Sequence, residues 1–231
     1  MTAAGAQGPG VVVRSDGPVT LVGGGRLGAG DLALARGHAP EVVAVDGGAG
    51  HVFEAGIAPL AVIGDMDSLP AAAAAAFADR LHAIAEQETT DFDKALRSTL
   101  APILLAVGFS GGRFDHELAV LNAIVRHAGR PCVVIGPESL TFHCPPRLII
   151  APPEGSVFSL FPMRPVALAS EGLRWPTGGL DLRPDGMIGT SNMVTGPVRL
   201  DPEGPGMLVI LPRGLLPLAV GALLAAPRWG G

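Results

Sequence analysis

Cysteine and charged residues are scarce in this 231-residue sequence, and each shortage excludes a class of protein. The two cysteines, Cys132 and Cys144, are too few for a disulfide framework, and neither has a nearby Cys or His pair at the spacing of zinc ligands. Charged residues make up 16% of the chain and hydrophobic residues 48%, which excludes an intrinsically disordered protein. We therefore expect a folded chain in which both cysteines are buried as small hydrophobic residues.

The sequence also lacks a basic stripe and a long hydrophobic run. Its net charge of −5 argues against nucleic acid as a partner, because such binding depends on Lys and Arg side chains that neutralise phosphates. The most apolar late stretch, residues 215–226, is too short to span a bilayer and contains Pro217. Residues 1–10 show no basic and apolar leader pattern and are expected to form a loose tail. These absences favour a cytoplasmic protein that binds neither nucleic acid nor membrane.

Apolar runs alternate with helical patterns in the first part of the chain. Strands are expected at residues 18–22, 41–45, 60–63, 82–85, 103–107 and 133–135. Helices are expected after Asp31, which could cap the first of them, after Pro70, from Asp91 to Leu100, and from His116 to His127. Strands that alternate with helices form parallel sheets. The sequence therefore predicts an α/β domain over residues 11–138, with an open, mostly parallel sheet flanked by helices.

The second part of the chain is rich in proline and in short runs typical of β-strands. Such runs occur at residues 148–150, 157–160, 166–169, 198–200 and 207–211. Turns such as Pro184-Asp185-Gly186 separate them. This pattern predicts a smaller all-β, sandwich-like domain over residues 139–231.

Four short patterns with acidic residues follow predicted strands or begin predicted helices. They are Asp46-Gly47-Gly48, Gly64-Asp65-Met66-Asp67-Ser68, Thr90-Asp91-Phe92-Asp93-Lys94 and Gly111-Gly112-Arg113-Phe114-Asp115-His116. Ligands of open α/β sheets bind beyond the carboxyl ends of the strands, so we expect these patterns to meet at one edge. Carboxylates there hold a hard cation such as Mg²⁺ together with substrate phosphates, while Arg and Lys neutralise phosphate oxygens. The sequence thus predicts a magnesium-dependent enzyme of phosphate chemistry.

The spacing within the second and third patterns suits that chemistry. Asp65 and Asp67 alternate on an extended segment, so both carboxylates can face one cation. Asp91 and Lys94 lie one turn apart at the start of a predicted helix. The N-terminus of a helix favours bound phosphate. Lys94 is also the only lysine, against fifteen arginines, which makes it a candidate functional residue. Asp93 is expected to be solvated.

The fourth pattern combines a flexible turn with charged groups. Arg113 suits a bidentate grip on phosphate, and the glycines before it permit close backbone approach. Asp115 could orient Arg113, bind metal or cap the following helix. His116 is expected to be structural.

Three other functions fit parts of the sequence. Gly23-x-Gly25-x-x-Gly28, followed by Asp46 after the next predicted strand, matches the fingerprint of an NAD(P)-binding Rossmann oxidoreductase. Asp65-x-Asp67 is also the metal motif of nucleotide-sugar transferases. A non-catalytic nucleotide-binding module, with solvated acids, is the third alternative.

In combination, the patterns resemble the thiamin pyrophosphokinase (thiamin diphosphokinase) family. That family shows Asp-Gly-Gly, Gly-Asp-x-Asp-Ser, Thr-Asp-x-x-Lys-Ala and Gly-Gly-Arg-x-Asp-His, and all four occur here in this order between Asp46 and His116. Gly172-Leu173-Arg174-Trp175 and Thr190-Ser191-Asn192 resemble its later motifs, so the resemblance covers roughly residues 18–212. It implies a homodimer with an α/β catalytic domain and a β-rich domain for thiamin binding and dimerisation. The implied reaction converts ATP and thiamin, which binds between subunits, to AMP and thiamin diphosphate.

The resemblance also implies which residues act on ATP. Asp65, Asp67 and Asp91 would bind Mg²⁺. Lys94 and Arg113 would hold the phosphates. Of these, Asp67, Asp91 and Arg113 would be catalytic.

Further residues follow from the same resemblance. Asp115 would lie near the phosphates, and Trp175, Ser191 and Asn192 would line the thiamin pocket. Asp46 would join the catalytic residues by positioning the thiamin hydroxyl or a metal-bound water. Many members have a Lys-Asp pair before the Thr-Asp, where this chain has Gln87-Glu88-Thr89, so one phosphate contact of the family is not expected here.

Overall fold

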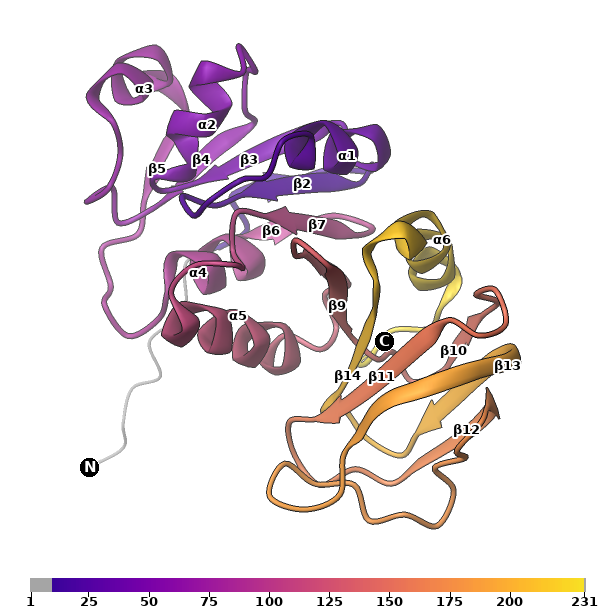
Figure 1. Cartoon of the computed structure of the whole chain (residues 1–231). Coiled ribbons are helices and arrows are strands. Elements are labelled where there is room, and N and C mark those ends of the chain that lie inside the picture. The colour runs from indigo at the N-terminus through magenta and orange to yellow at the C-terminus, as the bar shows by residue number, and fades with distance from the viewer. Residues whose placement is uncertain (1–9, 231) are drawn as a thin grey trace, which may run out of the picture.

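The computed structural model describes residues 10–230, which form a long sheet with helices on both faces of its first half (Figure 1). The tail predicted at residues 1–10 lies outside the described residues, apart from Gly10. Within residues 10–230, no helix is both long and apolar enough to cross a membrane.

The first half of the chain forms the parallel part of the sheet. In spatial order its strands are β8 (Cys132–Ile135), β7 (Leu104–Val107), β2 (Val19–Val22), β3 (Glu41–Val45), β4 (Ala61–Gly64) and β5 (Leu81–Ala83). Strands β2, β4, β7 and β8 are buried along their whole length, which explains their continuous apolar sequences. The connections run in one direction from β2 to β5 and in the other from β7 to β8, so the order reverses between β2 and β7.

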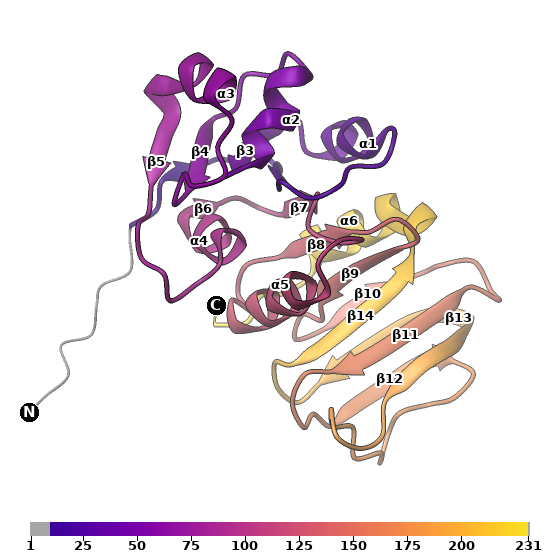
Figure 2. The ribbon, with the colours of Figure 1, turned by 60° about the vertical axis from the view of Figure 1, so that its left-hand side comes forward.

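Five helices cover the two faces of this parallel part. Helices α1 (Asp31–His38), α2 (Gly48–Glu54) and α3 (Ala71–Ala76) lie on one face, and α4 (Asp91–Ser98) and α5 (Phe114–Arg126) lie on the other (Figures 1 and 2). Alternate strand residues supply the two cores: Val22 packs in the cluster that contains Ala35 of α1, and Leu21 in the cluster that contains Leu96 of α4.

The second half of the chain is antiparallel. It contains β9 (Ser139–His143), β10 (Leu148–Ile150), β11 (Val157–Pro162), β12 (Leu168–Leu173), β13 (Gly189–Pro202) and β14 (Met207–Pro212). The first part of β13 pairs with β11, and its last part pairs with β10 on one side and β12 on the other. The long β13 strand thus links two ladders whose buried side chains share one core, as a sandwich requires. The predicted fold class, a parallel α/β sheet followed by an antiparallel β region, is confirmed.

The two parts are joined through hydrogen-bonded strands. β9 pairs antiparallel with β8 and also with β14, so the sheet continues from the parallel part into the antiparallel part. The boundary predicted between residues 138 and 139 lies in the turn between β8 and β9, and the division into domains 11–138 and 139–231 stays a prediction.

Several elements differ from the sequence pattern. Helix α2 is not predicted, because its first turn contains two glycines, which disfavour helix. Residues 215–226, considered above only as a possible membrane span, contain helix α6 (Leu216–Ala225) after the 3₁₀ helix η2 (Arg213–Leu215). Asp31 does not cap α1: Gly30 does, with a φ of 87° that suits glycine.

Short elements complete the fold. β1 (Val13–Arg14) and β6 (Thr99–Leu100) form a two-stranded parallel sheet, and η1 (Ala78–Arg80) is a second 3₁₀ helix. Both cysteines are buried and free, as expected, and burial raises the pKa of each thiol.

Candidate active site

Three of the predicted acidic residues meet at the carboxyl ends of two neighbouring strands. Asp46 directly follows β3, and Asp65 and Asp67 follow β4. Each offers a carboxylate oxygen, and these three atoms lie within 4.8 Å of one another. The adjacency of β3 and β4 thus brings together acids that are about twenty residues apart in sequence.

Asp46 is held in an unusual conformation and environment. Its φ of 44° is rare for a residue other than glycine, and its side chain is buried. Gly64 makes this possible, because a Cβ atom there would lie 2.8 Å from the Cβ of Asp46. Burial, helped by the charge of Asp91, raises the pKa of Asp46 despite a backbone hydrogen bond from Gly47. Asp46 Oδ1 has no hydrogen-bond partner, which is a state that native proteins avoid unless a ligand or water satisfies the atom.

Asp65 is held by hydrogen bonds from its own loop and from the segment before α4. Its carboxylate accepts hydrogen bonds from the Asp67 amide (3.3 Å) and from Gln87 Nε2 (3.2 Å). Burial opposes ionisation, but these bonds and the charge of Lys94 together outweigh it and lower the pKa of Asp65 overall. Asp67 is exposed and accepts a bond from Ser68 Oγ (2.9 Å). The cluster therefore keeps at least one ionised carboxylate near neutral pH.

Lys94 and Asp91 adjoin this cluster from the start of α4. Thr90 caps the helix through its side chain, which accepts a bond from the Asp93 amide. Lys94 is only 1% exposed, and its Nζ lies 2.9 Å from Asp91 Oδ1 and 3.5 Å from Asp65 Oδ2. Burial disfavours its charge, but Asp91 and Asp65 raise its pKa overall. Asp91 Oδ1 also accepts a bond from the Asp65 amide (3.1 Å), which ties α4 to the loop after β4.

The donor set of this cluster fits a hard divalent cation. Asp46, Asp65, Asp67 and Asp91 contribute four carboxylates, and among residues 10–230 Lys94 is the one cationic side chain bonded to them. Oxygen-only donors favour Mg²⁺ over softer metals. A cation beside Asp46 would also satisfy the buried Oδ1 atom.

The fourth motif lies at the start of α5. Arg113 forms two hydrogen bonds with Asp115, at 2.6 Å and 3.2 Å, and both side chains are largely exposed. Of the three roles considered for Asp115, orienting Arg113 is the one that this contact supports. Glu117, which the motif analysis does not single out, accepts bonds from the amides of Gly111 and Gly112 and so shapes the loop.

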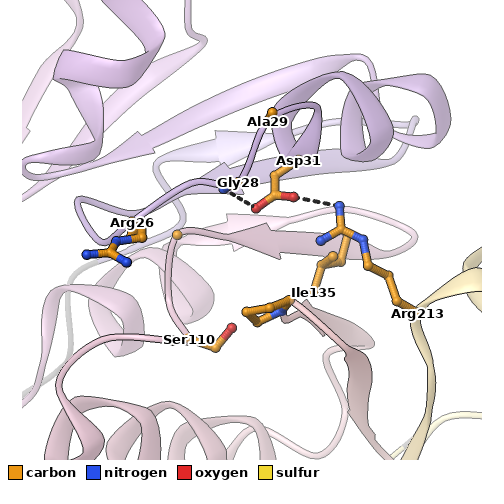
Figure 3. A pocket seen from close by; sticks show the side chains of 10 residues that line it. Arg26, Gly28, Ala29, Asp31, Ser110, Ile135 and Arg213 are labelled. Atoms are coloured by element: carbon orange, nitrogen blue, oxygen red, sulfur yellow. Dashed lines mark hydrogen bonds and ion pairs between the residues drawn. The ribbon is translucent and has the colours of Figure 1, made fainter.

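A pocket of about 590 Å³ opens beside this loop, where the strand order reverses between β2 and β7 (Figure 3). Its lining includes Arg26, Asp31, Ser110 and Arg213, none of which the motifs indicate. In Figure 3, Asp31 lies between the Gly28 amide, which donates to it at 2.7 Å, and Arg213 Nη2 at 2.5 Å. Crevices at such reversal points commonly bind ligands.

The residues predicted for thiamin binding lie together, but in the antiparallel region. The Asn192 side chain accepts a bond from the Trp175 amide (3.1 Å) and donates one to the Trp175 carbonyl (2.7 Å). Ser191 has a φ of 60°, and its amide donates to Ser159 Oγ. Trp175 is 53% exposed. These residues belong to the β12–β13 part of the molecule, at the opposite end from the β3 and β4 strands of the acidic cluster (Figures 1 and 2).

Comparison with known families matches both halves of the chain. The family described as thiamin pyrophosphokinase, catalytic domain, matches residues 34–135, and thiamin pyrophosphokinase, vitamin B1 binding domain, matches residues 140–201. The chain belongs to the thiamin pyrophosphokinase family. The two matches occur in the order that the sequence motifs predict.

Individual relatives agree with this assignment. Thiamine pyrophosphokinase 1 of Arabidopsis thaliana is 32% identical over 125 residues, which are 47% of this chain and 47% of the relative. Thiamine pyrophosphokinase 1 of Oryza sativa subsp. japonica is 28% identical over 190 residues, or 66% of this chain and 71% of the relative. The chain thus spans about half the length of the first curated relatives that it matches.

Solved structures of the family share the fold. Thiamin pyrophosphokinase from Candida albicans has a TM-score of 0.69 at 15% identity, with 87% of this chain and 92% of that chain covered. Yeast thiamin pyrophosphokinase has a TM-score of 0.68 at 16% identity, with 96% of both chains covered. At these identities the likeness concerns the fold.

Family membership and geometry both disfavour the oxidoreductase alternative. A Cβ atom on Gly23 or Gly25 would lie 2.7 Å or 2.6 Å from the carbonyl oxygen of Gly108, so close packing of two loops explains these glycines. Asp46 stands in a cluster of acids, whereas the fingerprint needs a single acid for a ribose hydroxyl. The nucleotide-sugar transferase alternative likewise gives no role to the match over residues 140–201.

Proposed function

We propose that this protein transfers the pyrophosphoryl group of ATP to the hydroxyl of thiamin, which yields thiamin diphosphate and AMP. The observation that carries the proposal is the convergence of Asp46, Asp65 and Asp67, with the buried Lys94 beside them, in a chain of the thiamin pyrophosphokinase family. In this reaction a bond forms between the thiamin oxygen and the β-phosphorus. The bond between that phosphorus and the oxygen bridging to the α-phosphate breaks, and AMP leaves.

Within the acidic cluster, we assign metal binding to Asp65, Asp67 and Asp91. Bound Mg²⁺ would supply positive charge against the phosphate oxygens. Asp46 would position the thiamin hydroxyl or a water molecule, since its unpaired Oδ1 is available for such a contact. The proximity of the carboxylates supports these assignments, with Asp91 linked to the other acids through Lys94 and the Asp65 amide.

Lys94 and Arg113 are assigned to the phosphates, with Asp115 beside Arg113. Transfer of a phosphoryl-type group depends chiefly on positioning and charge neutralisation, so fixed cations suffice for much of the effect. Lys94 is held rigidly by two carboxylates, whereas Arg113 is exposed and could leave Asp115 for a phosphate.

For thiamin, we propose a site lined by Trp175, Ser191 and Asn192 in a homodimer. The separation of these residues from the acidic cluster within one chain supports a site that a second subunit completes. Exposed apolar side chains in the same region would suit a dimer interface, and they include Ile149, Val157, Met187 and Ile188. A cytoplasmic location remains part of the proposal.

A product assay tests the reaction. Purified protein is incubated with ATP, Mg²⁺ and thiamin, and the products are separated by chromatography. We expect equal amounts of AMP and thiamin diphosphate, both abolished by EDTA. Folded protein that forms neither product under these conditions would refute the proposal.

A further inference from the structure

Asp93 lies within the third motif, between Asp91 and Lys94, but its side chain pairs with residues at the end of α5. The prediction that Asp93 is solvated is wrong, because the residue is only 2% exposed. Burying a carboxylate costs free energy unless charged partners compensate. The position of helix α4 therefore depends on the partners of Asp93.

The partners of Asp93 come from the end of α5 and from its own helix. Arg126 Nη1 donates to Asp93 Oδ2 at 3.0 Å, and His127 Nε2 lies 3.2 Å from Oδ1. Arg97, one turn further along α4, lies 3.8 Å from Oδ1. Burial opposes ionisation, but these three neighbours lower the pKa of Asp93 overall. The carboxylate therefore anchors α4 to α5.

Arg97 extends this contact to the segment before α4. Its Nη2 lies 2.7 Å from Glu86 Oε1. Glu86 also accepts bonds from the amides of Glu88 and Thr89, at 2.8 Å and 3.1 Å. This is the segment that carries Gln87, whose side chain donates to Asp65. One polar network thus holds both the start of α4 and the loop that leads into it.

We propose that Asp93 is a positioning residue for the acidic site. Its contacts with Arg126, His127 and Arg97 set the placement of the first turn of α4, from which Asp91 and Lys94 reach Asp65. The contact of Lys94 with Asp91 and that of Asp91 with the Asp65 amide are 2.9 Å and 3.1 Å long, so a small shift of the helix would break them. This inference rests on the proposed metal binding for its Mn²⁺ readout and on the proposed reaction for its catalytic readout.

The test compares Asp93→Asn with the wild-type protein and with Asp201→Asn. Asp201 is a suitable control because it also pairs with two arginines, Arg147 and Arg199, but lies in the antiparallel region. Binding of Mn²⁺ in the presence of a non-hydrolysable ATP analogue is followed by electron paramagnetic resonance. Kinetic constants are measured at a temperature at which circular dichroism shows every variant to be folded.

For Asp93→Asn we expect Mn²⁺ affinity and kcat to fall by about 10- to 100-fold, as for residues that orient metal ligands. KM for thiamin should stay within about twofold, and Asp201→Asn should match the wild type in every constant. A variant that loses thermal stability but keeps the Mn²⁺ affinity and kcat of the wild type would overturn the proposal.

A milder variant covers the case in which Asp93→Asn does not fold. Arg126 is half-exposed, so Arg126→Gln removes one partner of Asp93 at little risk to the fold. We expect a smaller loss of Mn²⁺ affinity and kcat in the same direction, and no loss at all would overturn the proposal.

A wild-type protein that binds Mn²⁺ but makes no thiamin diphosphate would refute the reaction alone, and the Mn²⁺ comparison would still decide the role of Asp93. A wild-type protein that binds no Mn²⁺ would overturn both.

Discussion

The α/β half and the antiparallel half of the molecule differ in how their buried polar groups are satisfied. Among the described residues, four buried side-chain atoms have no hydrogen-bond partner, and all lie in the α/β half: Asp46 Oδ1, Arg97 Nε, Ser98 Oγ and Thr99 Oγ1. In the antiparallel half, the buried side chains of Asn192, Thr177 and His143 are all hydrogen-bonded.

Of these four atoms, only that of Asp46 belongs to the acidic cluster, whereas the other three belong to α4 and β6. An unsatisfied buried atom costs stability, so its presence at a sheet edge favours a ligand that satisfies it. Asp46 Oδ1 meets this condition, since Asp46 lies at the end of β3 and belongs to a cluster of carboxylates. In the antiparallel half the Asn192 side chain instead satisfies the backbone of Trp175, which fixes the shape of that segment.

We expect the largest effect on activity from Asp67→Ala, which changes the acidic cluster of the α/β half. Asp67 is exposed, so its removal should change the free energy of unfolding by less than about 0.5 kcal/mol. It also supplies one of the three clustered carboxylates, so we expect activity to fall by about 1,000-fold or more. Steady-state assays and thermal unfolding, with Asp185→Ala as an exposed control, would measure both. A retained rate would remove Asp67 from the metal site.

Lys94→Met should affect activity and stability together. The variant leaves Asp91 and Asp65 without their buried cation, which should cost about 2 kcal/mol of unfolding free energy. Loss of a fixed positive charge should also lower kcat by about 100-fold. Urea unfolding and steady-state kinetics test the prediction. A variant as stable as the wild type would show that the ion pairs contribute little.

Asn192→Ala tests the antiparallel half. Removal of the two bonds to the Trp175 backbone should raise KM for thiamin by up to about 30-fold, because each bond contributes about 1 kcal/mol to the placement of Trp175. The concentration of Mg²⁺ that gives half-maximal activity should not change. A changed Mg²⁺ requirement would contradict the proposal that the α/β half binds the metal and the antiparallel half binds thiamin.

The last effect concerns stability at acidic pH. His143 is buried and accepts a bond from the Gly206 amide, and burial, with the charge of Arg164, lowers its pKa to about 4. Because this pKa is below the ordinary value of about 6.5, the unfolded state binds more protons between these two values. Stability should therefore fall as pH falls through this window, by at most about 1.4 kcal/mol per pH unit from this residue. Urea unfolding of the wild type and His143→Gln between pH 7 and 4 should show a weaker pH dependence in the variant.

Local patterns were sufficient to predict much of the fold. Apolar runs such as residues 41–45 identified the buried strands of the parallel sheet, and the proline-rich second half was predicted to be β-structure. Helix α2 escaped prediction because Gly48 and Gly50 disfavour helix, and tertiary packing overrode that preference. Strand β13 extends over fourteen residues although only 198–200 were predicted, because pairing with β10, β11 and β12 extends it beyond the apolar run.

The candidate site was predictable as a set of motifs but not as an arrangement. Arg113 and Asp115 are neighbours in sequence, and their contact follows from local spacing. The contacts of Asp93 with Arg126 and His127 join residues more than thirty positions apart, and no local pattern signals them. The pairing of Asp31 with Arg213 spans 182 positions.

The order of the motifs was enough to indicate the family and to suggest the reaction proposed above, because chemistry depends on which residue types occur and in what sequence context. Strand order and helix packing decide which oxygen lacks a partner, which carboxylate is buried and which residues face one another. Asp93 illustrates the difference: its position after Asp91 suggested a solvated acid, and the docking of α4 against α5 made it a buried one. Burial and pairing are properties of the packed chain, since they arise from segments that come together only on folding.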